Sequence, residues 1–185
     1  ANGVWNSGAT WGYSGDDVEG TGYPGAGDGA TVDSNIVTLG SDQSVGSVTI
    51  AGGDLVAAGY TLTTDGSFTR SSGTFTYGVS TVVFTAADTD NTIDMNAHTF
   101  YDVQFNNADA IWTMASDFDV DSSVLLSAGT LALDGYVVSV EGDWEVTSGT
   151  LIPTYGTVIF DATDTDNTIT SNTSSFYDVR FLGNG

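Results

Sequence analysis

Aspartate offers the most chemistry in this sequence, because it recurs in closely spaced clusters. One cluster occurs twice and combines carboxylates with an amide: Asp88, Asp90 and Asn91 in the first copy, and Asp164, Asp166 and Asn167 in the second, with Asp161 nearby. A second cluster places three carboxylates on alternate residues, Asp117, Asp119 and Asp121. Carboxylate and amide oxygens are the ligands that Ca²⁺ prefers in proteins. Calcium is therefore the cofactor that the sequence suggests, and these ten residues are the candidate metal ligands.

Ordinary turn chemistry is the competing explanation for both clusters. Asp and Asn side chains commonly bond their own backbone in turns, and an acidic strand face can simply be hydrated. The segment that starts at Asp117 resembles the beginning of an EF-hand loop, but Ser122 replaces the required glycine and Ala128 replaces the final glutamate. A saline habitat would also explain the excess of aspartate, so both explanations stay open.

Side chains with other catalytic chemistry are scarce. The chain has no Cys and no Lys, one His (His98) and two Arg (Arg70 and Arg180), which excludes thiolate metal sites, cysteine nucleophiles and Schiff-base lysines. Paired carboxylates can hydrolyse glycosides, but with 21 Asp a pairing carries no information. We therefore expect a protein that is not an enzyme and has no catalytic residues.

The net charge limits the kinds of partner. Two basic against 24 acidic residues give −22, which argues against nucleic acid and against anionic membranes. No apolar run approaches the ~20 residues that span a bilayer, so we expect no membrane insertion. The composition, rich in Thr, Ser, Gly, Asn and Asp, and the start at Ala1 are typical of processed secreted proteins. We expect an extracellular location; a cytosolic protein or a trimmed segment is the alternative.

An internal repeat of 76 residues organises the chain. The sequence Asp-Thr-Asp-Asn-Thr-Ile occurs at 88–93 and again at 164–169, and Phe-Tyr-Asp-Val-x-Phe occurs at 100–105 and 176–181. Residues 46–105 and 122–181 share 26 identities in 60 positions without a gap. Self-similarity of this length is the signature of a repeat architecture.

The repeat units have the pattern of β-strands. Apolar residues alternate with polar ones, as at Val82 and Phe84 or at Val103 and Phe105, and this period of two places each set on one strand face. Gly, Asp, Asn and Ser interrupt these runs about every 8–12 residues. No segment keeps a helical period, so the sequence predicts an all-β chain with almost no helix.

A parallel β-helix, or β-solenoid, is the predicted architecture. Three coils of about 25 residues would fill one repeat, and seven coils would form a rod on the order of 35 Å long at ~4.8 Å per coil. The predicted parts are an N-terminal capping or docking segment (1–45), a first repeat unit (46–121) and a second, incomplete unit (122–185). The alternative is a β-sandwich or meander of two homologous units.

Several motifs carry a resemblance to a known class of proteins. Trp5-Asn6 with Ala9-Thr10-Trp11, the run 23–32 and the two copies of the repeat resemble repeat-containing bacterial and archaeal extracellular surface proteins. The resemblance implies a right-handed parallel β-helix displayed at the cell surface in an adhesin, sheath, surface layer or filament. These motifs specify coils and identify no substrate.

Assembly is the function that the end of the second repeat suggests. Phe105 is followed by a further coil-like stretch, whereas few residues follow its counterpart Phe181, so the last coil would expose an unpaired strand edge. We expect a structural protein that joins copies of itself head to tail through Trp5, Trp11, Tyr177, Val179 and Phe181. The alternative is a piece of a large adhesin or a carbohydrate-binding module, which would use Trp11, Trp112 and Trp144 to stack on surface glycans. Trp144 aligns with Phe68 in the other copy of the repeat, however, and this favours a core position for it.

Overall fold

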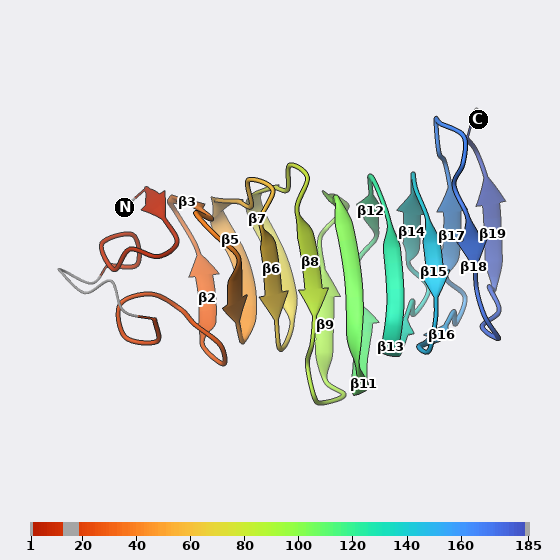
Figure 1. Ribbon diagram of the computed structural model, residues 1–185, viewed down its shortest axis with the longest axis horizontal. Coiled ribbons are helices and arrows are strands. Elements are labelled where there is room, and N and C mark those ends of the chain that lie inside the picture. The colour runs from red at the N-terminus through yellow and green to blue at the C-terminus, as the bar shows by residue number, and fades with distance from the viewer. Residues whose placement is uncertain (1, 13–18, 184–185) are drawn as a thin grey trace.

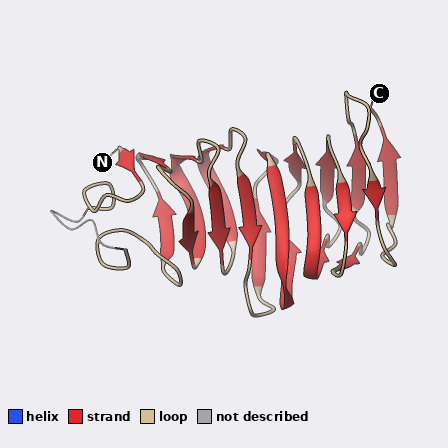
Figure 2. Ribbon diagram, in the orientation of Figure 1, coloured by secondary structure: helices blue, strands red, loops and turns tan. Residues whose placement is uncertain are grey.

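The computed structural model describes residues 2–12 and 19–183, and its parallel strands coil into a β-solenoid of about eight turns (Figure 1). The described residues contain strands and loops but no helix (Figure 2). Every strand pairing is parallel, which excludes the sandwich and meander alternatives for this part of the chain. The all-β, solenoid prediction is confirmed.

Most strands are short because they cross a single face of a narrow coil. They are β1 (Gly3–Val4), β2 (Gly29–Val32), β3 (Ile36–Thr38), β4 (Gln43–Val45), β5 (Ser47–Val56), β6 (Thr61–Thr64), β7 (Phe68–Thr76), β8 (Thr81–Phe84), β9 (Asn91–Asp94), β10 (His98–Phe100), β11 (Asp102–Met114), β12 (Phe118–Val120), β13 (Val124–Ala132), β14 (Val137–Val140), β15 (Trp144–Val146), β16 (Thr150–Ile152), β17 (Thr157–Phe160), β18 (Ile169–Thr170) and β19 (Asp178–Phe181). The four longest, β5, β7, β11 and β13, bend around a corner and contribute to two faces.

Three faces run along the solenoid. Face 1 consists of β2, the first halves of β5 and β7, β9, the second halves of β11 and β13, and β16. Face 2 consists of β1, β3, the second halves of β5 and β7, and then β10, β12, β14, β17 and β19. Face 3 consists of β4, β6, β8, the first halves of β11 and β13, β15 and β18.

The turns are shorter than the sequence predicts. Partners on face 2 follow one another at Phe118, Val138 and Val158, a spacing of 20 residues. The prediction of seven 25-residue coils is therefore wrong, and the solenoid has about eight turns of about 20 residues. Two turns do span 25 residues, from Phe68 to Ile93 and from Trp144 to Ile169. In both, the extra length forms a loop that contains the repeated Asp-Thr-Asp-Asn segment.

The sequence repeat does not contain a whole number of turns. Val82 pairs with Val103 in the first copy, and their counterparts Val158 and Val179 pair in the same register. However, β8 lies on face 3 and β17 on face 2. Three full turns lead from Val82 on face 3 to Trp144 on the same face, and the chain then passes over face 1 to reach Val158 on face 2. Each repeat is therefore rotated by one face, and the two 25-residue turns project their loops toward opposite edges in Figure 1.

Inward-facing side chains form one continuous core along the axis. Alternate residues of each strand are buried, which produces stacks of Val, Leu and Ile with aromatic rings between them. Phe68, Phe84 and Phe100 pack edge to face, with ring centroids 5.5–6.5 Å apart. Trp144, the counterpart of Phe68, is also fully buried. Edge-to-face contacts add stability beyond area burial, so this aromatic column fixes the middle of the rod.

A cap closes the N-terminal end of the core. Trp5 has no exposed surface, and its Nε1 donates to the carbonyl oxygen of Pro24 at 3.0 Å. Trp11 lies edge-on against it at 4.9 Å and donates from Nε1 to the carbonyl oxygen of Trp5 at 2.7 Å. The structure corrects the assembly role predicted for Trp5, because a fully buried indole serves the cap of its own chain. Trp11 is half-buried and keeps some exposed surface.

Candidate functional site

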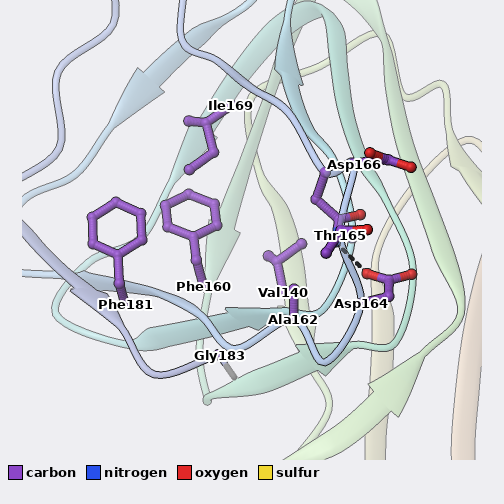
Figure 3. Close-up of a pocket in the computed structure, with 11 residues that line it drawn as sticks. Val140, Phe160, Ala162, Asp164, Thr165, Asp166, Ile169, Phe181 and Gly183 are labelled. Carbon is purple, nitrogen blue, oxygen red and sulfur yellow. Dashed lines mark hydrogen bonds between the residues drawn. The ribbon is translucent and has the colours of Figure 1, made fainter. Parts of the chain in front are cut away.

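The C-terminal end of the solenoid has no comparable cap among the described residues. All four residues of β19 are exposed, although the strand pairs with β17 along its whole length. A hollow of about 460 Å³ opens at this end between Phe160, Ile169 and Phe181 on one side and the loop at 164–167 on the other. Figure 3 shows the rings of Phe160 and Phe181 side by side, with Ile169 above them.

Exposed apolar surface is concentrated at this end. Eleven large apolar side chains are exposed among the described residues, and seven belong to the last two turns: Ile152, Tyr155, Ile169, Tyr177, Val179, Phe181 and Leu182. A concentrated apolar patch on a protein surface commonly marks an interaction site. We call this surface the C-terminal end; it includes the hollow and the outer edges of β16, β18 and β19.

The first repeat shows the same residues when a further turn covers them. Phe105 has no exposed surface, because it stacks on Phe84 at 5.0 Å and meets Trp112 at 5.2 Å. Its counterpart Phe181 stacks on Phe160 at 5.4 Å but is 69% exposed. In the first repeat, this phenylalanine packs on the preceding turn and is covered by a following one. At the C-terminal end only the contact with the preceding turn is present.

The repeated asparagine gives the same contrast. Asn91 is 4% exposed and donates from Nδ2 to the carbonyl oxygens of Asp88 (3.0 Å) and Ile111 (3.3 Å), the second of which lies on the next turn. Asn167 is exposed and its Nδ2 donates to Oδ1 of Asp164. In the first repeat, the asparagine of the Asp-Thr-Asp-Asn segment thus ties its loop to the following turn, which is a structural role.

The predicted metal ligands lie in three groups, and the second and third approach each other where Asp161 acts on Asp119. Asp88 and Asp90 lie in the first 25-residue turn, and the second copy of the cluster lies in the second. The third group flanks β12, where Asp117 accepts from the backbone N–H of Val137 at 2.8 Å and Asp121 accepts from the Tyr77 hydroxyl at 2.6 Å. Within 2–12 and 19–183, no three carboxylate or imidazole groups gather closely enough to hold a metal ion. Calcium binding stays a prediction.

Acidic side chains form a column at the corner that follows face 2. Three residues occupy equivalent positions on successive turns: Asp121, Glu141 and Asp161. The backbone N–H of each donates to the backbone carbonyl oxygen of the residue that ends the face-2 strand one turn earlier. Successive turns are ~4.8 Å apart, so these carboxylates repel one another. Burial, reinforced by the charge of neighbouring carboxylates, raises the pKa of Glu141.

Two neighbours of this column respond to its charge. Burial raises the pKa of Asp119, and the charges of Asp161, Asp121 and Asp117 add to the rise, although a hydrogen bond from Ser139 opposes it. The hydrogen bond to Asp121 is the main reason that the pKa of Tyr77 is raised to about 12. The corner therefore holds negative charge at an electrostatic cost to the fold.

Acidification should stabilise the protein because of this column. A carboxyl with a raised pKa in the folded chain favours folding when it is protonated; this contribution is complete below its ordinary pKa and is lost as the pH rises through the folded value. We expect a higher melting temperature at pH 5 than at pH 7. Combining Asp119→Asn with Glu141→Gln should raise the melting temperature at pH 7 and flatten the pH dependence, as followed by circular dichroism.

The matched control for this experiment is Asp109→Asn, which removes one exposed acidic charge outside the column. The control should keep the pH dependence of the parent chain. A double variant whose melting temperature changes with pH as steeply as that of the control would show that the column does not destabilise the fold.

Most of the residues considered for catalysis or glycan stacking pack or form hydrogen bonds within the fold. Arg70 donates from Nη2 to the carbonyl oxygen of Gly73 at 2.7 Å and from Nη1 to that of Met95 at 3.5 Å. Burial, with a smaller contribution from the Arg70 charge, lowers the pKa of His98. Trp112 and Trp144 have no exposed surface, so the stacking role that the carbohydrate-binding alternative gives them is wrong. Arg180 is exposed on β19.

No family model, no curated protein and no solved structure matches the chain. Among the described residues, the structure has no helix of the length and apolarity needed to cross a membrane.

The sequence identified part of the C-terminal end. Tyr177, Val179 and Phe181 are 56%, 42% and 69% exposed there. It missed Ile169 and Phe160, which line the hollow. The alignment of the two repeats contained the missing signal, because the counterparts Ile93 and Phe84 contact Met114 and Trp112, which lie in the stretch that follows the first repeat's Phe105.

Proposed function

We propose that this chain is a non-enzymatic structural protein that assembles end to end through its C-terminal end. In this proposal, copies stack head to tail by β-strand addition and build an extracellular filament, sheath or surface layer. The observation that supports the proposal is the open apolar end of the parallel strand ladder, where β19 is fully paired on one edge and fully exposed.

Strand edges and apolar rings both favour a partner at this position. Unpaired edges usually are covered, charged or twisted away, and an edge that stays open is a template for strand addition. Burying a side chain such as Phe181 contributes about 1.5–3 kcal/mol. At the opposite end, β1 presents a two-residue parallel strand, and Val4 (50%) and Ile36 (40%) are exposed. A contact between two different ends is heterologous, and it generates a filament when its rotation does not close into a ring.

Charge is the main force against assembly. A net charge of −22 makes copies repel one another, and this repulsion is screened beyond ~8 Å at physiological ionic strength. Assembly should therefore strengthen as salt is added. The C-terminal end carries Arg180, one of the two basic residues of the chain, but Asp164 and Asp166 line its hollow.

Sedimentation velocity at increasing protein and salt concentration tests the proposal. We expect the unmodified chain to form larger species as both rise, and Phe181→Glu to prevent this by placing a charge in the contact. The matched control is Val79→Glu, at an apolar residue that is 67% exposed but far from the C-terminal end along the solenoid; it should assemble like the parent. Monomers under every condition, or equal assembly by the Phe181→Glu variant, would refute the proposal.

A further inference from the structure

The first repeat contains a copy of the C-terminal end with its partner in place. Residues 106–132 form the turn that covers Phe84, Ile93 and Phe105, and these three correspond to Phe160, Ile169 and Phe181. The internal contact therefore shows which chemistry fits the open end. It concerns the same surface and rests on the proposed function only in treating this end as a place of assembly; it names a repeat-type turn, and not the N-terminal end of a second copy, as the partner.

We propose that the C-terminal end is completed by a parallel β-solenoid turn of the 106–132 type, led by an indole that packs on Phe160 and Phe181. The hollow is the first support. In the first repeat Trp112 lies 6.4 Å from Phe84 and 5.2 Å from Phe105. The corresponding position at the C-terminal end is the hollow of about 460 Å³ beside Phe160 and Phe181.

Backbone register is the second support. In the first repeat β9 pairs with β11 so that Asn91 lies opposite Trp112 and Ile93 opposite Met114. At the C-terminal end β18 holds Ile169 in the same register against Trp144 as Ile93 has against Phe68. Asn167, which lines the hollow, is therefore positioned to donate to the incoming strand as Asn91 donates to Ile111.

The third support comes from β19 and fixes the orientation of the incoming unit. Val103 on β11 lies opposite Val124 of the next turn, and Val179 is the counterpart of Val103. The incoming turn would thus continue both β18 and β19. Because each repeat is rotated by one face, the partner's own repeat would be rotated by one face relative to the second copy of this chain.

The N-terminal cap of a second copy is the competing partner. Its strand β1 has two residues, whereas the matching strands of the first repeat pair over Asn91–Ile93 and Val103–Phe105. The cap's Trp5 is fully buried, so it has no free surface for Phe160 or Phe181. A turn of the 106–132 type therefore pairs with more strand residues and packs on more exposed rings than the cap does. Docking of the cap is one of the outcomes that the test distinguishes.

A graft tests this inference on the full chain. Residues 182–185 are replaced by a copy of residues 106–133, so that the copied turn follows Phe181 as the original follows Phe105. The matched control is the same graft with Trp→Ala at the copied position 112. We expect amide exchange in β18 and β19 to slow at least tenfold with the indole, the melting temperature to rise by about 4 °C or more, and the control graft to show much less of both. Equal exchange rates in the two grafts would overturn the inference.

A second measurement covers a graft that fails to fold. A synthetic peptide with the sequence of residues 106–121 is added to the unmodified chain, and exchange in β18 is followed by mass spectrometry. Saturable protection that is lost when the peptide carries Trp→Ala at position 112 supports the inference, and absence of protection at millimolar peptide refutes it. A chain that never self-associates but is protected by the graft would refute the proposed self-assembly alone. Self-association with an ineffective graft would instead favour the N-terminal cap.

Discussion

Phe105→Ala should lower the free energy of unfolding by about 3–5 kcal/mol, whereas Phe181→Ala should change it by less than about 1 kcal/mol. The two residues occupy the same position of the repeat, so their local sequence is matched. They differ in surroundings, because Phe105 lies between Phe84 and Trp112 and Phe181 is 69% exposed. Truncation at Phe105 leaves a cavity, while truncation at Phe181 mainly removes hydrated surface.

Urea denaturation at low protein concentration gives both values under conditions where any association is weak. The comparison is sensitive because it needs only the difference between two variants of one protein. Equal losses at the two positions would mean that Phe181 is covered in the isolated chain, and that the C-terminal end is closed.

Asn91→Ala should lower the free energy of unfolding by about 1–3 kcal/mol, because it removes the two hydrogen bonds that the nearly buried Asn91 amide donates to the carbonyl oxygens of Asp88 and Ile111. Asn167→Ala is the matched control and should change the stability by a few tenths of a kcal/mol, since Asn167 is exposed and bonds within its own loop. The measurement is again chemical denaturation.

Calcium distinguishes this structural role from a metal-binding one. If the Asp-Thr-Asp-Asn loops bind the ion, Asn167→Ala should weaken a calcium-dependent rise in melting temperature. If the asparagine serves only to tie turns together, the stability difference between the Asn91 and Asn167 variants should be the same with calcium and with chelator. A stability difference between the two variants that changes when calcium is added would rule out the purely structural role of the asparagine.

The fold class could be predicted from the sequence because the strand pattern is local. Alternation at Val82 and Phe84 or at Val103 and Phe105 specifies which side of a strand is buried, and all four side chains are buried. The length of a turn could not be predicted in the same way. A solenoid with three short strands per turn shows the same alternation on every face, so nothing local distinguishes one full turn from two-thirds of a turn.

The repeat itself caused the error in turn length. A period of 76 residues is close to three times 25, which favoured 25-residue coils, but it contains three 20-residue turns and two further faces. Only the two turns with the inserted loops, such as Phe68 to Ile93, have the predicted length. Successive copies of one sequence therefore need not lie on one face of a solenoid, provided that the inward positions of all three faces accept similar side chains.

Side-chain roles are harder to predict than strand positions. The sequence predicts Trp5 at an assembly surface, and the structure places it inside the N-terminal cap, where its Nε1 reaches Pro24. A Gly-rich aromatic segment has the same sequence pattern whether it caps its own chain or contacts a second copy. The acidic residues are similar: Asp117 and Asp121 accept hydrogen bonds from Val137 and Tyr77, and these partners are 20 and 44 residues away. Long-range partners of this kind are set by the stacking of turns.

Hydrogen exchange as a function of protein concentration tests the assembly proposal most directly. In dilute solution, amides of β18 and β19 should exchange much faster than those of their counterparts β9 and the first half of β11, which lie between two turns. At high concentration and high salt, protection should rise at 169–182. Exchange at 169–182 that is already as slow as in the first repeat, or that stays unchanged while the protein associates, would show that this end is not where the chains meet.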